Sequence, residues 1–187
     1  MSSPVFTLPN VLTLARIAGV PLLVASLYLD QPAAAYASTA VFAAASVTDY
    51  FDGYLARKLN QPSELGRVLD PIADKLLVAA ALVMLAAVGG AAPIAVTAIL
   101  CRELLVSGMR EALAGRVVLA VTMLAKWKTA SQMSALLLLL IAPAVASSAF
   151  GAAAEAALWL AVALSWLTAA DYLRSAWRVV AGAAPRD

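Results

Sequence analysis

The chain has 187 residues, about the length of one domain. Hydrophobic residues make up 64% of it, charged residues only 13%, and the mean hydropathy is +0.90. Soluble domains carry about 25% charged residues, so this chain has too few to cover a surface that faces water. The same numbers exclude a disordered chain, because disorder requires low hydrophobicity and high charge. We therefore expect one integral membrane domain over residues 1–187.

The ionisable residues restrict the chemistry. The net charge of +2 gives no strongly basic field, so nucleic acid is not an expected partner. Cys101 is the only cysteine, and the sequence contains no histidine. An internal disulfide, a zinc site built on cysteine pairs and catalysis by a histidine base are therefore excluded.

Turn signals divide the chain into six apolar stretches, each close to the roughly 20 residues that cross a bilayer. The predicted spans cover about residues 10–29, 33–57, 71–88, 92–113, 118–141 and 151–173. The fourth break is expected at Gly115-Arg116, and the fifth from Pro143 to Gly151.

The positive charges are distributed unevenly over the breaks between these spans. The first, third and fifth breaks contain no Lys or Arg, whereas the second and fourth breaks and the C-terminal tail contain Lys58, Arg67, Arg116, Arg174, Arg178 and Arg186. Positive residues remain on the cytoplasmic side of a membrane. The pattern predicts an all-α bundle of six transmembrane helices with both termini in the cytoplasm.

Acidic residues gather where the second predicted span ends and the third begins. Asp49 and Asp52 are three positions apart, and Asp70 and Asp74 are four apart, so each pair shares a helical face. The short break makes the two helices antiparallel neighbours, which brings all four carboxylates together near the cytoplasmic end. Oxygen ligands without His or Cys select hard ions such as Mg²⁺ or Mn²⁺. Four acids suit a pair of such ions, an arrangement used in phosphoryl chemistry.

Small residues and one arginine continue the face of the first acid pair. Gly53 and Ala56 would let a ligand approach the helix backbone, and Arg57 can bind a phosphate through two parallel hydrogen bonds. The stripe therefore has the features of a docking surface for a phosphorylated ligand.

Single members of this group also have structural explanations. Asp70 before Pro71 fits a helix N-cap followed by proline at the first helical position. Asp74 and Lys75 fit first-turn charges at an interface, and Gly53 fits a packing contact between helices. None of these explains why four acids converge in a chain with so few charges.

The string Asp49-x2-Asp52-Gly53-x2-Ala56-Arg57-x8-Gly66-x3-Asp70-x3-Asp74 resembles the signature of the CDP-alcohol phosphotransferases, with every residue and spacing matched. The resemblance implies six transmembrane helices, a homodimer and an active site near the cytoplasmic face. It implies transfer of a phosphoalcohol group from a CDP-linked donor to a hydroxyl, with release of CMP. It assigns Asp49, Asp52, Asp70 and Asp74 to two metal ions, Mg²⁺ or Mn²⁺, and makes Asp74 the general base. The nucleotide and diphosphate would contact Gly53, Ala56, Arg57 and Gly66.

Three further segments, residues 8–16, 102–111 and 126–129, resemble bacterial phosphatidylglycerophosphate synthases. This resemblance implies CDP-diacylglycerol as donor, sn-glycerol 3-phosphate as acceptor, and a bacterial plasma membrane. The basic residues expected to hold the acceptor phosphate are Arg16, Arg102, Arg110, Lys126 and Lys128.

The positions of these cations agree with a phosphorylated acceptor, because an unpaired cation beside the hydrocarbon core is costly. An ion-pair network of Arg102 with Glu103 and Glu111 is the structural alternative. Lys126 and Lys128 are two positions apart and do not share a helical face, so one of them can extend to the interface instead.

The sequence therefore predicts a synthase that forms phosphatidylglycerophosphate and CMP from CDP-diacylglycerol and glycerol 3-phosphate in phospholipid biosynthesis. Three alternatives stay open at this point. The same family includes enzymes with another acceptor, either phosphatidylglycerol in a cardiolipin synthase or an inositol phosphate. A divalent-cation transporter also places acids inside a membrane bundle. In a helical scaffold, the acids would only cap helices and form ion pairs.

Overall fold

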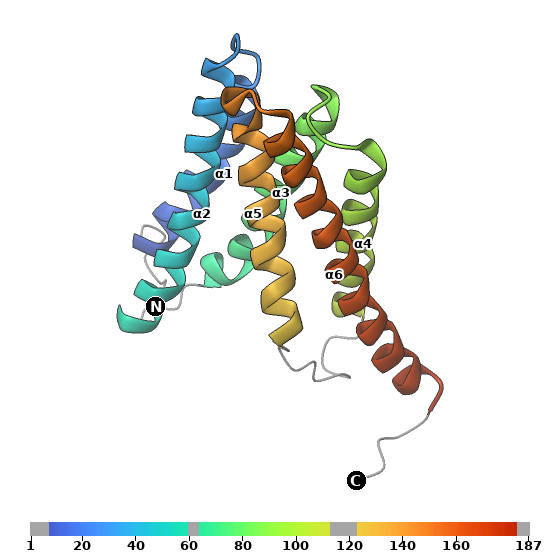
Figure 1. Cartoon of the computed structure of the whole chain (residues 1–187). Coiled ribbons are helices and arrows are strands. Elements are labelled where there is room, and N and C mark those ends of the chain that lie inside the picture. The colour runs from blue at the N-terminus through green and yellow to red at the C-terminus, as the bar shows by residue number, and fades with distance from the viewer. Residues whose placement is uncertain (1–7, 60–63, 113–122, 183–187) are drawn as a thin grey trace.

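The computed structural model describes residues 8–59, 64–112 and 123–182, with the side chains of 8–10, 49–59, 64–68 and 178–180 outside the description. All regular structure in these ranges is helical (Figure 1). The helices are α1 (Leu8–Ser26), α2 (Ala33–Leu59), α3 (Glu64–Ala87), α4 (Pro93–Ala112), α5 (Met123–Val145) and α6 (Ser148–Val180). The predicted all-α class and the number of helices are confirmed for the described part of the chain.

The helices form a bundle with two distinct ends (Figure 1). The connections α1–α2, α3–α4 and α5–α6 lie at one end, and these are the breaks without Lys or Arg. At the other end α2, α4 and α6 finish and α1, α3 and α5 begin. Helix α5 packs against both α2 and α6, α1 packs against α2 and α3, and α4 packs mainly against α6. The most deeply buried apolar side chains of the core are Leu23, Phe42, Leu77, Leu82, Ile99, Leu136, Leu140 and Leu158.

Two predicted helix boundaries at prolines are wrong. Helix α3 begins at Glu64, so Pro71 lies inside it and Asp70 is not its N-cap. Likewise α5 continues through Pro143 to Val145, and α6 begins at Ser148. Proline removes one backbone hydrogen bond, and neighbouring helices can compensate for that loss in a packed bundle.

The remaining predicted boundaries agree with the structure to within a few residues, except that α6 extends to Val180. The predicted break at Gly115-Arg116 and the start of the fifth span at 118 lie outside the described residues.

Two of the described helices are long and apolar enough to cross a membrane, α5 and the segment Ser148–Trp177 of α6. Only 28% and 22% of their most apolar windows are buried inside the protein. Large apolar side chains elsewhere are also exposed, among them Ile94 and Leu104 on α4. Such extended apolar surfaces are typical of helices that contact lipid, which agrees with a membrane protein.

Candidate active site

Two acids of the signature lie one helical turn apart on α3, and each contacts a buried polar residue of α1. Thr13 Oγ1 donates a hydrogen bond to Asp70 Oδ1. Arg16 Nη1 lies 2.7 Å from Asp74 Oδ1. Thr13 is fully buried and Arg16 is 1% exposed, whereas 45% of the Asp74 side chain is exposed. Helix α1 therefore orients both carboxylates while Asp74 remains accessible to a ligand.

The other signature residues lie on helices whose side chains are not described at these positions. Helix α2 extends to Leu59, so Asp49, Asp52, Gly53, Ala56 and Arg57 belong to a continuous helix, and Gly66 belongs to the first turn of α3. Their side chains lie outside the described residues. Within the described part of the chain, no group of three or more His, Cys, Asp or Glu residues is placed to hold a metal ion.

A second polar cluster joins α4, α5 and α6. Arg102 is buried, and its Nε donates to the Ser165 carbonyl oxygen at 2.9 Å and its Nη2 to Thr168 Oγ1 at 2.7 Å. Its Nη1 lies 3.0 Å from Glu103 Oε1, and the same carboxylate oxygen accepts a hydrogen bond from Lys128 Nζ. Arg102 therefore ties α4 to α6, and Glu103 ties α4 to α5.

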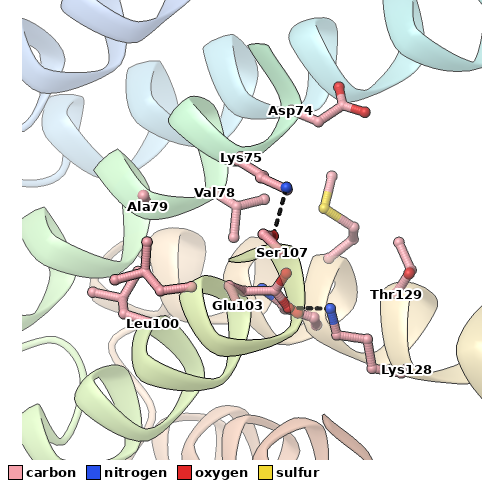
Figure 2. A pocket seen from close by; sticks show the side chains of 12 residues that line it. Asp74, Lys75, Val78, Ala79, Leu100, Glu103, Ser107, Lys128 and Thr129 are labelled. Carbon is pink, nitrogen blue, oxygen red and sulfur yellow. Dashed lines mark hydrogen bonds and ion pairs between the residues drawn. The ribbon is translucent and has the colours of Figure 1, made fainter. Parts of the chain in front are cut away.

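Three cavities meet at Asp74. The largest, about 640 Å³, lies between α3, α4, α5 and α6, and its polar lining includes Lys75, Arg102, Glu103, Arg110 and Lys128. A second, about 440 Å³, is lined by both apolar and polar side chains of α3, α4 and α5, with charged residues at one side (Figure 2). The third, about 320 Å³, includes Arg16 from α1 and Ala45 and Ser46 from α2. Asp74 lines all three cavities, as does Thr129.

Three of the five predicted acceptor-site cations line one cavity, and the other two lie elsewhere. Arg110 and Lys128 line the largest cavity, and Arg110 Nη2 donates to the Tyr172 hydroxyl at 2.7 Å. Arg102 also borders this cavity, but its guanidinium is engaged by the three contacts described above. Arg16 borders the cavity on the α2 side and contacts Asp74. Lys126 is exposed and lines none of these three cavities.

Sequence reasoning left four polar residues without a functional role, Thr13, Lys75, Ser107 and Thr129. Lys75 Nζ donates to Ser107 Oγ at 2.6 Å, which bridges α3 and α4 at the cavity wall (Figure 2). Ser and Thr in apolar helices are common packing residues, so their types alone gave no signal. The position of Lys75 directly after Asp74 was the one sequence feature that could have indicated it.

Comparison with known proteins decides the family. Residues 6–167 match the model of the CDP-alcohol phosphatidyltransferases, which is most of the chain. The chain belongs to this family. The predicted resemblance is thus confirmed, and the match includes both acid pairs of the signature.

Similar members of this phosphatidyltransferase family have two different names. A protein of Arabidopsis thaliana named CDP-diacylglycerol–glycerol-3-phosphate 3-phosphatidyltransferase 2 is 43% identical, over 96% of this chain and 84% of its own length. A protein of Rickettsia bellii is named CDP-diacylglycerol–glycerol-3-phosphate 3-phosphatidyltransferase. It is 42% identical to this chain, and the match covers 90% of this chain and 94% of the length of that protein. A cardiolipin synthase (CMP-forming) of Oryza sativa subsp. japonica is 40% identical over 93% of this chain and 58% of its own.

Proposed function

We propose that this protein transfers the phosphatidyl group from CDP-diacylglycerol to sn-glycerol 3-phosphate, giving phosphatidylglycerophosphate and CMP. The observation that carries the proposal is the set of relatives with that activity in their names, from a plant and from bacteria. They are 37–43% identical over at least 90% of this chain. The complete acidic signature and the basic cavity beside Asp74 support the same reaction.

The residues of the signature fit a pair of divalent ions. Asp70 and Asp74 offer oxygen donors one turn apart, and both are oriented by hydrogen bonds or ion pairs from α1. Asp49 and Asp52 would complete the ligand set from α2, and the oxygen-only donors suit Mg²⁺ or Mn²⁺. When bound, such ions neutralise charge on the donor diphosphate and on the leaving CMP.

Two of the three cavities at Asp74 would give each substrate its own side of this residue. The cavity beside α2 lies next to the helix that carries Gly53, Ala56 and Arg57, so we assign the donor nucleotide and diphosphate, with Gly66, to that side. The large cavity between α3, α4, α5 and α6 contains the cations, and we assign the acceptor to it. Asp74 lines both cavities and would therefore lie between the two reactants.

In the reaction, a hydroxyl oxygen of the acceptor attacks the phosphorus that carries the diacylglycerol. The new phosphorus–oxygen bond forms as the bond to the CMP oxygen breaks, and the hydroxyl proton passes to the Asp74 carboxylate. Arg16 holds this carboxylate through Oδ1, so we assign Arg16 a positioning role instead of a contact with the acceptor phosphate. Arg110 and Lys128 line the cavity that we assign to the acceptor and would contact its phosphate. Lys126 is exposed and lines none of the three cavities, so we assign it no contact with that phosphate.

The setting of the reaction is part of the proposal. The exposed apolar helices would lie in the bilayer as six spans, where the acyl chains of the donor remain. The charged end of the bundle, where α1 begins and α6 ends, would face the cytoplasm of a bacterial inner membrane (Figure 1). A homodimer is expected from the family resemblance.

Cardiolipin synthesis is the second candidate, because the similar Oryza sativa protein has that name. Its acceptor would be phosphatidylglycerol, which has a free hydroxyl but carries its phosphate as a diester. The two activities share the donor, CMP release and the role of Asp74, so the acceptor alone distinguishes them.

The test is CMP release by detergent-purified protein with CDP-diacylglycerol and Mg²⁺ or Mn²⁺. Glycerol 3-phosphate, phosphatidylglycerol and an inositol phosphate are supplied separately as acceptors. We expect turnover with glycerol 3-phosphate alone. Turnover only with phosphatidylglycerol would replace the proposed function by cardiolipin synthesis, and no CMP release with any acceptor would reject both.

A further inference from the structure

Charged side chains of both signs line the large cavity. Four cations and three carboxylates line it, the cations being Lys75, Arg102, Arg110 and Lys128. Glu103 lies within ion-pair distance of both Arg102 and Lys128, and Asp74 is paired with Arg16 from outside this cavity. The third carboxylate, Glu111, makes no ion pair with any residue that the structure describes.

The other two cations of the cavity contact neutral oxygens. Among the described residues, Lys75 Nζ donates to Ser107 Oγ at 2.6 Å, and Arg110 Nη2 donates to the Tyr172 hydroxyl at 2.7 Å. Arg110 also lies over the Tyr172 ring, 5.6 Å from its centroid. These contacts hold the two side chains in place without cancelling their charge. Both cations are exposed, so a soluble anion can reach them.

We propose that Lys75 is a specificity-determining residue that binds the acceptor phosphate together with Arg110. The proposal deepens the proposed function and rests on it. An ammonium has three donors, and Ser107 accepts one of them, which leaves donors for phosphate oxygens. A phosphate monoester carries about −1.5 to −2 charges at neutral pH, which matches two cations that have no carboxylate partner among the described residues.

The position of Lys75 on α3 supports this role. Asp74 and Lys75 are consecutive, so their side chains point about 100° apart around the helix. Asp74 contacts Arg16 on α1, while Lys75 points to Ser107 on α4 (Figure 2). Both line the large cavity. An acceptor with its phosphate on Lys75 would therefore present a hydroxyl, one glycerol backbone away, to the carboxylate of Asp74.

This arrangement explains selection of a monoester over a diester. Phosphatidylglycerol has one negative charge and no terminal phosphate, so it would leave one of the two cations without a counter-charge. Lys128 cannot provide the same selectivity, because it already contacts the Glu103 carboxylate, which it shares with Arg102. Lys75 and Arg110, not Lys128, would then set the preference for glycerol 3-phosphate.

The experiment compares Lys75→Gln, Lys75→Arg and Ser107→Ala with wild type, and uses Arg174→Gln as a matched control. Arg174 is an exposed cation of α6 that pairs with Asp171 and lines none of the three cavities. Steady-state CMP release gives kcat and the KM of each substrate. Thermal protection of the purified protein by inorganic phosphate or glycerol 3-phosphate, without donor, gives a second reading that does not require turnover.

We expect Lys75→Gln to raise the KM for glycerol 3-phosphate by about tenfold to a hundredfold, the usual effect of losing a hydrogen bond to a charged group. The KM for CDP-diacylglycerol and kcat should change much less. Lys75→Arg should recover part of the loss, Ser107→Ala should raise the same KM by a smaller factor, and phosphate should protect Lys75→Gln less than wild type. Arg174→Gln should behave as wild type in every assay.

An unchanged acceptor KM in Lys75→Gln, with wild-type turnover of glycerol 3-phosphate intact, would overturn the inference and leave the proposed function standing. Both Lys75→Gln and Lys75→Arg could instead lose kcat, the affinity for donor and acceptor, and thermal stability in parallel. That result would show that Lys75 only joins α3 to α4. Wild-type turnover with phosphatidylglycerol alone would overturn the proposed function. In that case, thermal protection by inorganic phosphate that is lost in Lys75→Gln would still support the anion site. Equal protection of wild type and Lys75→Gln, or no protection of either, would overturn the anion site as well.

Discussion

Replacement of Arg102 by methionine separates a structural role for this cation from a role in acceptor binding. The guanidinium makes two hydrogen bonds to α6, at 2.9 Å to the Ser165 carbonyl and 2.7 Å to Thr168 Oγ1, and it is 6% exposed. Hydrogen bonds between membrane helices average about 0.6 kcal/mol and reach about 1.7 kcal/mol. Arg102→Met should therefore lower the free energy of unfolding by about 1 to 3.5 kcal/mol, since methionine keeps the aliphatic volume but neither bond.

The acceptor KM should respond far less to this change. Glu103 keeps its contact with Lys128 when Arg102 is replaced, so the charges that face the cavity from Lys75 and Arg110 are unaffected. The free energy of unfolding is measured in mixed micelles of dodecyl maltoside and SDS. The KM for glycerol 3-phosphate is measured well below the unfolding temperature. Thr168→Ala is the matched variant, because it removes one of the two bonds to α6 and should cost about 0.6 to 1.7 kcal/mol.

The opposite result would refute this reasoning. If Arg102→Met raised the KM for glycerol 3-phosphate by about tenfold or more and left the unfolding free energy at its wild-type value, Arg102 would contact the acceptor phosphate. The three contacts of its guanidinium would then have to open when the acceptor binds.

Three further predictions concern the acids and their partners on α1. Asp74→Asn should lower kcat by about 10²-fold to 10⁴-fold, the usual contribution of a general base, while Mn²⁺ binding, measured by calorimetry, falls less; an equal loss of both would contradict the assignment of the base. Thr13→Val removes the hydroxyl that donates to Asp70, and we expect Mn²⁺ affinity to fall by about 10-fold or more, as is usual for a residue that orients a metal ligand. If Thr13→Val lowered stability but kept the wild-type Mn²⁺ dependence of CMP release, Thr13 would have only a packing role. Removal of divalent ions with EDTA should abolish CMP release, and added Mg²⁺ or Mn²⁺ should restore it; release that persists in EDTA would argue against metal-dependent transfer.

The family and the reaction class followed from the sequence because the signature depends on short-range spacing. Asp49 and Asp52, and Asp70 and Asp74, need only the helical repeat to share a face, and both pairs lie in helices of the structure. The apolar composition likewise predicted a helical bundle without any tertiary information. The boundaries at Pro71 and Pro143 were mispredicted because local rules treat proline as a terminator, whereas packing against neighbouring helices allows it inside.

The roles of the cations required the tertiary structure. Sequence reasoning assigned the same expected role to five cations, each a costly charge near the membrane: Arg16, Arg102, Arg110, Lys126 and Lys128. Their partners differ only after the helices pack, because the contacts join residues about 60 positions apart in the chain, such as Arg16 with Asp74 and Arg102 with Ser165.

The sequence by itself thus determined the helical class, the acidic signature and the family, since periodicity and spacing are local properties of a helix. Only the tertiary structure decided that Arg102 and Lys128 share the carboxylate of Glu103. It also decided that Lys75 and Arg110 line the cavity and donate hydrogen bonds to neutral hydroxyl groups. The physical reason is that the rotation of one helix against another determines which side chains meet, and helical periodicity does not specify that rotation.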